Sequence, residues 1–164
     1  MFRIVSVIIS FFIISCNTTT YFIVRHAEKE MTNTMSMDVP LSKAGKERAE
    51  ALKDLLTDKN IHSIYSTNYS RTLSTVEPLR SKNELTIQLY DTKDTLDRFI
   101  AGLKKINTGN VLIAGHSNTV PVIVNKLTGK TVITGDLPDT AYGDLYIVKK
   151  RGNHFSYTKS HFGL

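Results

Sequence analysis

Two short segments of the chain place histidine directly after an apolar run. Arg25-His26-Ala27-Glu28 follows the run at residues 20–24, and Gly115-His116-Ser117-Asn118 follows the run at residues 111–114. Both runs are typical of buried strands, and open parallel sheets bind their ligands at the carboxyl ends of the strands. We therefore expect the side chains of Arg25, His26 and His116 to meet at one edge of a sheet.

Two further expected strands also end in polar side chains. Ser66 and then Ser70-Arg71-Thr72 follow residues 61–65, and Asp91 follows residues 85–90. Arginine binds phosphate oxygens bidentately, a neutral imidazole can attack phosphorus, and a carboxylic acid can protonate the leaving oxygen. Two arginines, two histidines and a carboxylate at one edge of a sheet predict a site for phosphoryl chemistry.

Helical patterns occupy the segments between these strands. Apolar residues recur at helical spacing after Ser42, which stands at an N-cap position, and Gly129 follows the last helical segment. The expected strands are residues 20–24, 61–65, 85–90 and 111–115. The expected helices cover about residues 43–56, residue 70 to residues 78–80, residues 94–105 and residues 118–128.

The end of the chain has a different pattern. Residues 144–149 and 155–159 flank Gly152-Asn153, which predicts an antiparallel hairpin, with Tyr142 and Asp144 at its entry. The basic run at residues 149–151 is interpreted as its solvated turn and not as a nucleic-acid site. Alternating strands and helices followed by a hairpin predict an α/β domain, a three-layer α/β/α arrangement around a mainly parallel sheet.

The N-terminal residues have the pattern of an export signal. Residues 4–14 are apolar except for two serines, which is too short to span a membrane and typical of the apolar region of a signal peptide. Cys16, the only cysteine, follows in a context that resembles the bacterial lipobox. We expect a signal peptide at residues 1–15, a lipidated Cys16 with a tether at residues 16–19, and the folded domain at residues 20–164. The alternative is an ordinary signal peptide with an incidental cysteine.

The ordered motifs resemble the histidine phosphatase superfamily, which has the phosphoglycerate-mutase-like fold. The resemblance covers about residues 20–121, and with Cys16 it points to a small bacterial lipoprotein branch. The first motif of this superfamily usually reads Arg-His-Gly, and this chain has Ala27 in place of the glycine. The backbone at Ala27 is therefore expected to have a negative φ. The resemblance rests on Arg25-His26-Ala27-Glu28, Leu41-Ser42 with Gly45 and Arg48-Ala49, Ser66 with Ser70-Arg71-Thr72 and Thr75, and Gly115 to Pro121.

The resemblance implies a role for each site residue. His26 is the expected nucleophile that becomes phosphohistidine. Arg25, Arg71 and His116 are expected to bind the phosphoryl oxygens, where each donor stabilises the charge of the transition state, and Asn118 is expected to support them. The proton donor stays open: Asp91 is preferred over the alternatives Glu28 and Asp94.

The implied activity is that of a metal-independent phosphomonoesterase without a cofactor, exported and anchored through Cys16 on the periplasmic or cell-surface side of a bacterial membrane. Its substrate is expected to be a phosphorylated small molecule or a phosphorylated envelope component, not a nucleic acid. A net charge of +6 favours anionic ligands. A phosphomutase is the second interpretation, disfavoured because a domain of this size lacks a large lid. A non-catalytic phosphate-binding module is the third.

Overall fold

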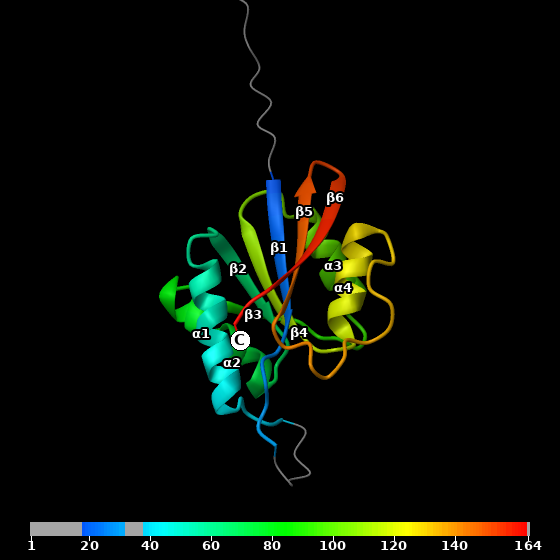
Figure 1. Ribbon diagram of the computed structural model, residues 1–164. Helices are drawn as coiled ribbons and strands as arrows, with labels where there is room; N and C mark the ends of the chain where they lie inside the picture. The colour runs from blue at the N-terminus through cyan, green and yellow to red at the C-terminus, as the bar shows by residue number, and fades with distance from the viewer. Residues whose placement is uncertain (1–17, 32–37, 164) are drawn as a thin grey trace, which may run out of the picture.

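A computed structural model describes residues 18–31 and 38–163 (Figure 1). The expected signal peptide, Cys16 and residues 32–37 lie outside the described residues. Within the described part, no helix is long and apolar enough to cross a membrane. The elements, in chain order, are β1 (Thr18–Arg25), α1 (Lys43–Leu56), β2 (Ile61–Ser66), α2 (Ser70–Lys82), β3 (Ile87–Leu89), α3 (Leu96–Lys105), β4 (Asn110–Gly115), α4 (Thr119–Thr128), β5 (Asp144–Arg151) and β6 (His154–His161).

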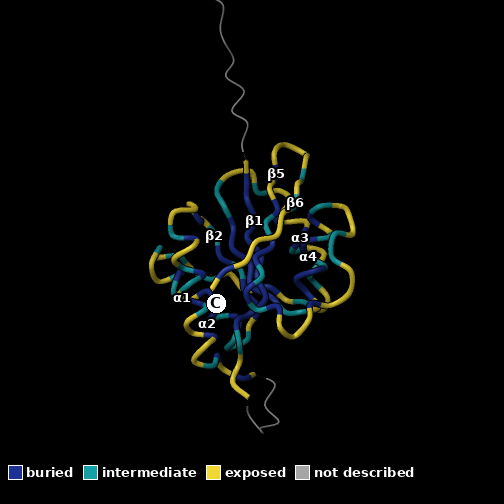
Figure 2. Tube along the Cα trace, viewed as in Figure 1, coloured by how far each residue is buried: buried dark blue, intermediate teal, exposed yellow. Residues whose placement is uncertain are grey.

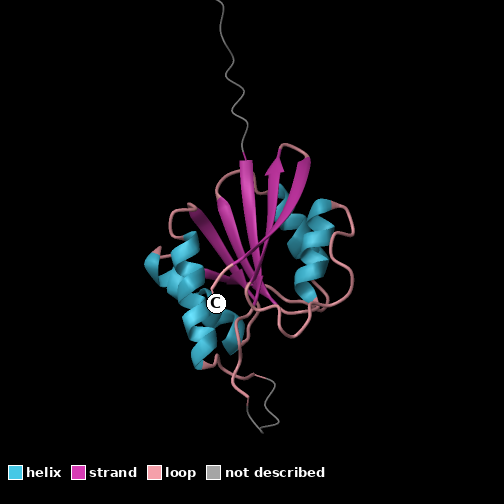
Figure 3. Ribbon diagram, in the orientation of Figure 1, coloured by secondary structure: helices cyan, strands magenta, loops and turns pink. Residues whose placement is uncertain are grey.

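The strands form one mixed sheet in the order β3-β2-β4-β1-β5-β6, with helices on both faces (Figure 3). Strands β1 to β4 are mutually parallel, whereas β5 pairs antiparallel with both β1 and β6. This confirms the predicted α/β fold with its terminal hairpin, which turns at Gly152 with a φ of 61°. Because β1 and β4 are neighbours with Arg25 opposite Gly115, the two histidine motifs leave the sheet side by side.

The two faces of β1 pack against different helix pairs, and the strands form the buried centre of the molecule (Figure 2). Tyr21 and Ile23 belong to the apolar cluster formed with α3 and α4, and Phe22 and Val24 belong to the cluster formed with α1 and α2. Alternation along a strand sends successive side chains to opposite faces. A strand buried on both faces therefore reads as the unbroken apolar run seen in the sequence.

Two predicted boundaries were wrong. Helix α2 continues past Pro78 to Lys82, because Val76 and Leu79 are buried and keep this last turn packed against the sheet. A proline inside a helix removes one backbone hydrogen bond, and here the packing outweighs that loss. Strand β3 is shorter than predicted, because the N–H of Leu85 donates to the carbonyl of Arg80 at 3.1 Å and so belongs to the turn that follows α2.

Helix α1 lies directly against the turn that follows β1. Ser42 caps the helix by accepting a hydrogen bond from the N–H of Gly45 at 3.1 Å, as its position in the sequence predicted. A Cβ atom on Gly45 would overlap the carbonyl oxygen of Glu28. The glycine of this motif thus permits a close approach between α1 and the backbone beside His26.

Replacing Gly45 by alanine is expected to destabilise the protein by about 1–3 kcal/mol, because the added methyl group meets backbone that cannot move away cheaply. The matched control is Gly102→Ala in α3, where a Cβ meets nothing within 4 Å. That change is expected to stabilise by about 0.5–1 kcal/mol through helix propensity. Urea unfolding of both variants measures the two effects, and equal shifts for both would contradict this account of Gly45.

Candidate active site

One cavity of about 740 Å³ opens where the parallel strands end, and it receives most of the predicted site residues. Arg25, His26, Arg71, His116 and Asn118 all line it. The remaining lining residues are Lys29, Met31, Tyr69, Thr92, Ser117, Asp136, Asp139 and Tyr142.

The ring of His26 is held by a hydrogen bond at one of its two nitrogens, Nδ1. The backbone N–H of His26 donates to the backbone carbonyl of Gly115 at 2.9 Å, which connects the end of β1 to the end of β4. Its Nδ1 lies 2.8 Å from the carbonyl oxygen of Ala27. A carbonyl only accepts hydrogen bonds, so Nδ1 carries the proton and Nε2 holds the lone pair of the neutral ring. The imidazole is therefore in the tautomer that a nucleophile requires.

His116 is held in the opposite tautomer. Arg71 Nη2 lies 3.4 Å from its Nδ1, and since a guanidinium only donates, that nitrogen holds the lone pair. Nε2 donates to the hydroxyl of Thr67 at 2.8 Å, and Thr67 donates in turn to Thr72 at 2.9 Å. The hydroxyl of Thr72 donates to backbone carbonyls, which completes the chain. The two imidazole rings lie 5.6 Å apart, centroid to centroid.

Both imidazoles are electrically neutral at pH 7. Burial is the largest cause that lowers the pKa of His26 to about 4; the hydrogen bond to Ala27 acts to raise this pKa, and the charges of Arg71 and Arg25 also lower it. Burial and the same two arginines also lower the pKa of His116 to about 4. Desolvation and neighbouring positive charges both disfavour an imidazolium, so both effects act in the same direction here.

Arg25 is almost completely buried. Its Nη1 donates to the carbonyl of Pro138 at 2.8 Å, and its Nη2 pairs with Asp139 at 3.2 Å. Tyr142 supports it from one side, with the guanidinium carbon 4.5 Å from the ring centroid. Among the described residues, its Nε is the buried side-chain nitrogen that has no hydrogen-bond partner. The carbonyl, the carboxylate and the tyrosine ring thus fix the position of a guanidinium group that lines the cavity.

Arg71 has a matching aromatic support. Its guanidinium carbon lies 4.5 Å from the ring centroid of Tyr69, and that ring also packs edge-on against His116 at 5.1 Å. Tyr142 likewise lies 6.0 Å from the ring of His26. Each arginine of the site is thus stacked on a tyrosine that also contacts one of the two histidines.

The turn after His26 is fixed by groups from two helices. The N–H of Ala27, which does not have a positive φ, donates to Thr75 of α2 at 2.9 Å. Glu28 pairs bidentately with Arg48 of α1, at 2.6 Å for Nη2 and 2.8 Å for Nε. Burial acts to raise the pKa of Glu28, but the hydrogen bonds and charge of Arg48 outweigh it and hold that pKa below its ordinary value. Glu28 is therefore a structural anion and poorly suited to donate a proton.

The other predicted donors lie away from the cavity. Asp91 is exposed and accepts a hydrogen bond from the N–H of Lys93 at 3.0 Å, whereas its neighbour Thr92 lines the cavity. Asp94 is exposed and does not line it either. Asn118 does line it, at the start of α4, but caps that helix through no side-chain hydrogen bond.

Sequence reasoning missed Tyr69, Asp136, Asp139 and the role of Tyr142. Tyr142 was predicted to lie at the hairpin entry, and it does lie two residues before β5, but its ring reaches back to the site. The two aspartates come from the segment between α4 and β5, which has no periodic pattern. Across residues 18–31 and 38–163, no three His, Cys, Asp or Glu side chains group as metal ligands do.

Comparison with known proteins agrees with this geometry. Residues 21–96 match the family model described as histidine phosphatase superfamily (branch 1). No curated protein matches the chain. Over residues 21–96 the chain is thus similar to the histidine phosphatase superfamily.

Solved structures share its fold at low sequence identity. The protein histidine phosphatase SixA in complex with tungstate is 15% identical with a TM-score of 0.67, over 87% of this chain and 96% of that one. A mycobacterial glucosyl-3-phosphoglycerate phosphatase is 12% identical with a TM-score of 0.65, over 88% and 98%. A phosphoglycerate mutase from Bacillus anthracis is 16% identical with a TM-score of 0.61, over 88% and 93%. These three proteins of the same fold are two phosphatases and one mutase.

The neutral histidines predict a pH-dependent stability. A pKa near 4 in the folded state, against about 6.5 when unfolded, means that the unfolded chain binds more protons in this interval. The two neutral histidines contribute fully to the free energy of unfolding above pH 6.5, and this contribution is lost as the pH falls toward 4. Thermal unfolding should show a falling Tm between pH 7 and pH 5, with a shallower slope in a His26→Gln, His116→Gln double variant.

The control for that measurement is His154→Gln, because His154 is exposed on β6. It should leave the slope of Tm against pH unchanged. A double variant with the slope of the unmodified protein would show that the two histidines are not neutral in the folded site.

Proposed function

We propose that the protein is a metal-independent phosphomonoesterase that acts through a phosphohistidine intermediate on His26. The observation that carries this proposal is the tautomer of His26: its Nδ1 is bound to the carbonyl of Ala27, so that Nε2 has a free lone pair. Arg25 and Arg71 line the same cavity as this ring and supply the positive charge that a phosphoryl group requires, and the neutral His116 lies beside them.

The reaction would proceed in two displacements. Nε2 of His26 attacks phosphorus while Arg25 and Arg71 bind the phosphoryl oxygens, and the bond from phosphorus to the ester oxygen breaks. The leaving oxygen takes a proton and departs as an alcohol. Water then attacks phosphorus, the bond to Nε2 breaks, and inorganic phosphate leaves a neutral imidazole behind.

The substrate class would be a phosphorylated small molecule or a phosphorylated envelope component. Lys29 adds a further positive charge to the cavity lining, and Met31 adds an exposed apolar side chain. Both follow the first histidine motif closely, at the rim where the part of the substrate beyond its phosphate would lie.

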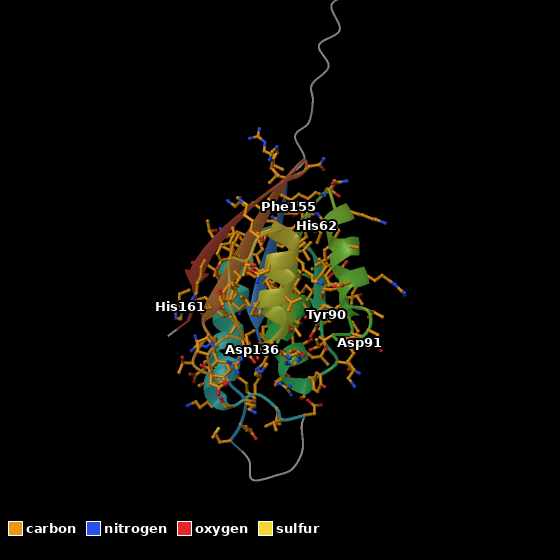
Figure 4. The ribbon with its side chains drawn as sticks, turned by 90° about the vertical axis from the view of Figure 1, so that its right-hand side faces the viewer. His62, Tyr90, Asp91, Asp136, Phe155 and His161 are labelled. Atoms are coloured by element: carbon orange, nitrogen blue, oxygen red, sulfur yellow. The ribbon has the colours of Figure 1, made fainter. Side chains whose placement is uncertain are left out.

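The decisive experiment is hydrolysis of p-nitrophenyl phosphate at pH 5–7 with EDTA present. The unmodified protein should turn over, the His26→Ala variant should not, and Arg71→Ala should lose a hundredfold to about a thousandfold in rate. His62→Ala is the control, because His62 lies at the opposite end of the molecule from Asp91 and Asp136, which mark the end with the cavity (Figure 4). It should be as active as the parent.

Three results would count against the proposal. Loss of turnover in EDTA with recovery on adding a divalent cation would show a metal-dependent reaction. Transfer of the phosphoryl group to a second hydroxyl, without release of inorganic phosphate, would favour the phosphomutase. Binding of phosphate esters with no turnover would favour a binding module.

We also propose that the protein is anchored through a lipid on Cys16. Strand β1 runs from Thr18 to Arg25 (Figure 1). Arg25 and His26, at the end of the strand away from Thr18, line the cavity. An anchor at Cys16 would leave the site at the end of the domain away from the attachment point. Cys16→Ser should abolish labelling by radioactive palmitate and move the protein from the membrane fraction to the soluble fraction, with kcat/KM unchanged. A variant that stays in the membrane fraction would contradict this.

A further inference from the structure

The proposed reaction needs a group that protonates the leaving oxygen, and we propose that this group is Asp136. This inference rests on the proposed phosphatase activity. Among the described residues, the carboxylates that line the cavity are those of Asp136 and Asp139, so the choice lies between these two.

Asp139 is committed to another partner. Its Oδ1 lies 3.2 Å from Nη2 of Arg25, a guanidinium whose side chain is only 6% exposed. This ion pair holds the Asp139 carboxylate against Arg25 instead of leaving it available to the leaving oxygen. The pair also positions Arg25, together with the carbonyl of Pro138. Asp139 is thus a positioning residue for the phosphate-binding arginine.

Asp136 has no such commitment. Its carboxylate makes no ion pair and no hydrogen bond to any other described residue, and its side chain is exposed to the cavity. A carboxyl group that lines the cavity without a fixed partner can exchange protons both with solvent and with a bound ester. General acid catalysis requires a donor within hydrogen-bond reach of the leaving oxygen, and a carboxyl group in the cavity lining can take up that position.

The backbone around Asp136 is nevertheless fixed. The N–H of Leu137 donates to the carbonyl of Ser117 at 2.9 Å, and the Leu137 side chain is buried in the cluster beneath α4. Gly135 has a φ of 69°, which turns the chain immediately before Asp136. The aspartate is therefore held beside the turn that carries His116. Figure 4 shows Asp136 at the same end of the molecule as Asp91, but it is Asp136 that lines the cavity.

The proton then follows a balanced path. As the bond from phosphorus to the ester oxygen breaks, the O–H of Asp136 gives its proton to that oxygen, and an alcohol leaves. The resulting carboxylate takes a proton from the water that attacks the phosphohistidine. Asp136 thus ends the cycle protonated, and the net reaction consumes one water and releases one alcohol and one phosphate.

The test compares two esters with different leaving groups. p-Nitrophenolate leaves without protonation, whereas the alkoxide from glycerol phosphate does not. In Asp136→Asn, kcat/KM should fall about a hundredfold to a thousandfold on glycerol phosphate and less than about tenfold on p-nitrophenyl phosphate. Asp139→Asn should lower both rates by the same factor, because it loosens Arg25. Asp58→Asn, beyond the far end of α1, should change neither rate.

The outcomes separate the possible errors. Equal losses on both esters in Asp136→Asn would mean that the residue only supports the site, and would overturn the assignment. A loss confined to glycerol phosphate in Asp91→Asn, with Asp136→Asn unaffected, would make Asp91 the donor. If the unmodified protein hydrolyses neither ester, the proposed phosphatase activity is wrong, and so is the assignment of Asp136 as its proton donor.

Discussion

The hydrogen bond between Nδ1 of His26 and the carbonyl of Ala27 is the interaction on which the rest of the site depends. It fixes the tautomer of the imidazole, and it can form only while the backbone turn at residues 26–28 keeps its shape. That turn is held from three sides, by Gly115 of β4, Thr75 of α2 and Arg48 of α1. The close approach of α1 at Gly45 and the side-by-side ends of β1 and β4 are thus requirements of one hydrogen bond.

Electrostatics impose the second constraint. Arg25 is buried in the site and Arg71 lies beside His116, so the charges of both guanidinium groups act on the two imidazoles. Under these conditions a protonated histidine is costly, and both imidazoles remain neutral with pKa values near 4. Stacking on Tyr142 and Tyr69 stabilises the two guanidinium groups without supplying negative charge. A phosphoryl dianion would bring negative charge close to both guanidinium groups.

Much of this could be predicted from the sequence, because strand ends carry a local signal. An apolar run followed by Arg25-His26 or Gly115-His116 identifies both a buried strand and the polar side chain at its end, and all these ends meet at one edge of a parallel sheet. The boundaries of α2 and β3 were harder to predict. Burial of Val76 and Leu79 outweighs the proline between them, and such packing depends on the tertiary structure.

The identity of the proton donor could not be predicted from the sequence. The sequence next to His116 contains no acid, and Asp91 was the best candidate because it follows a strand. In space, the acid beside His116 comes from the segment between α4 and β5, brought there by one hydrogen bond from Leu137 to Ser117. Loop residues such as Asp136 follow no periodic pattern, and loops carry much of the variation between related proteins. The strand ends would then determine how phosphate is bound, and this loop which leaving groups are accepted.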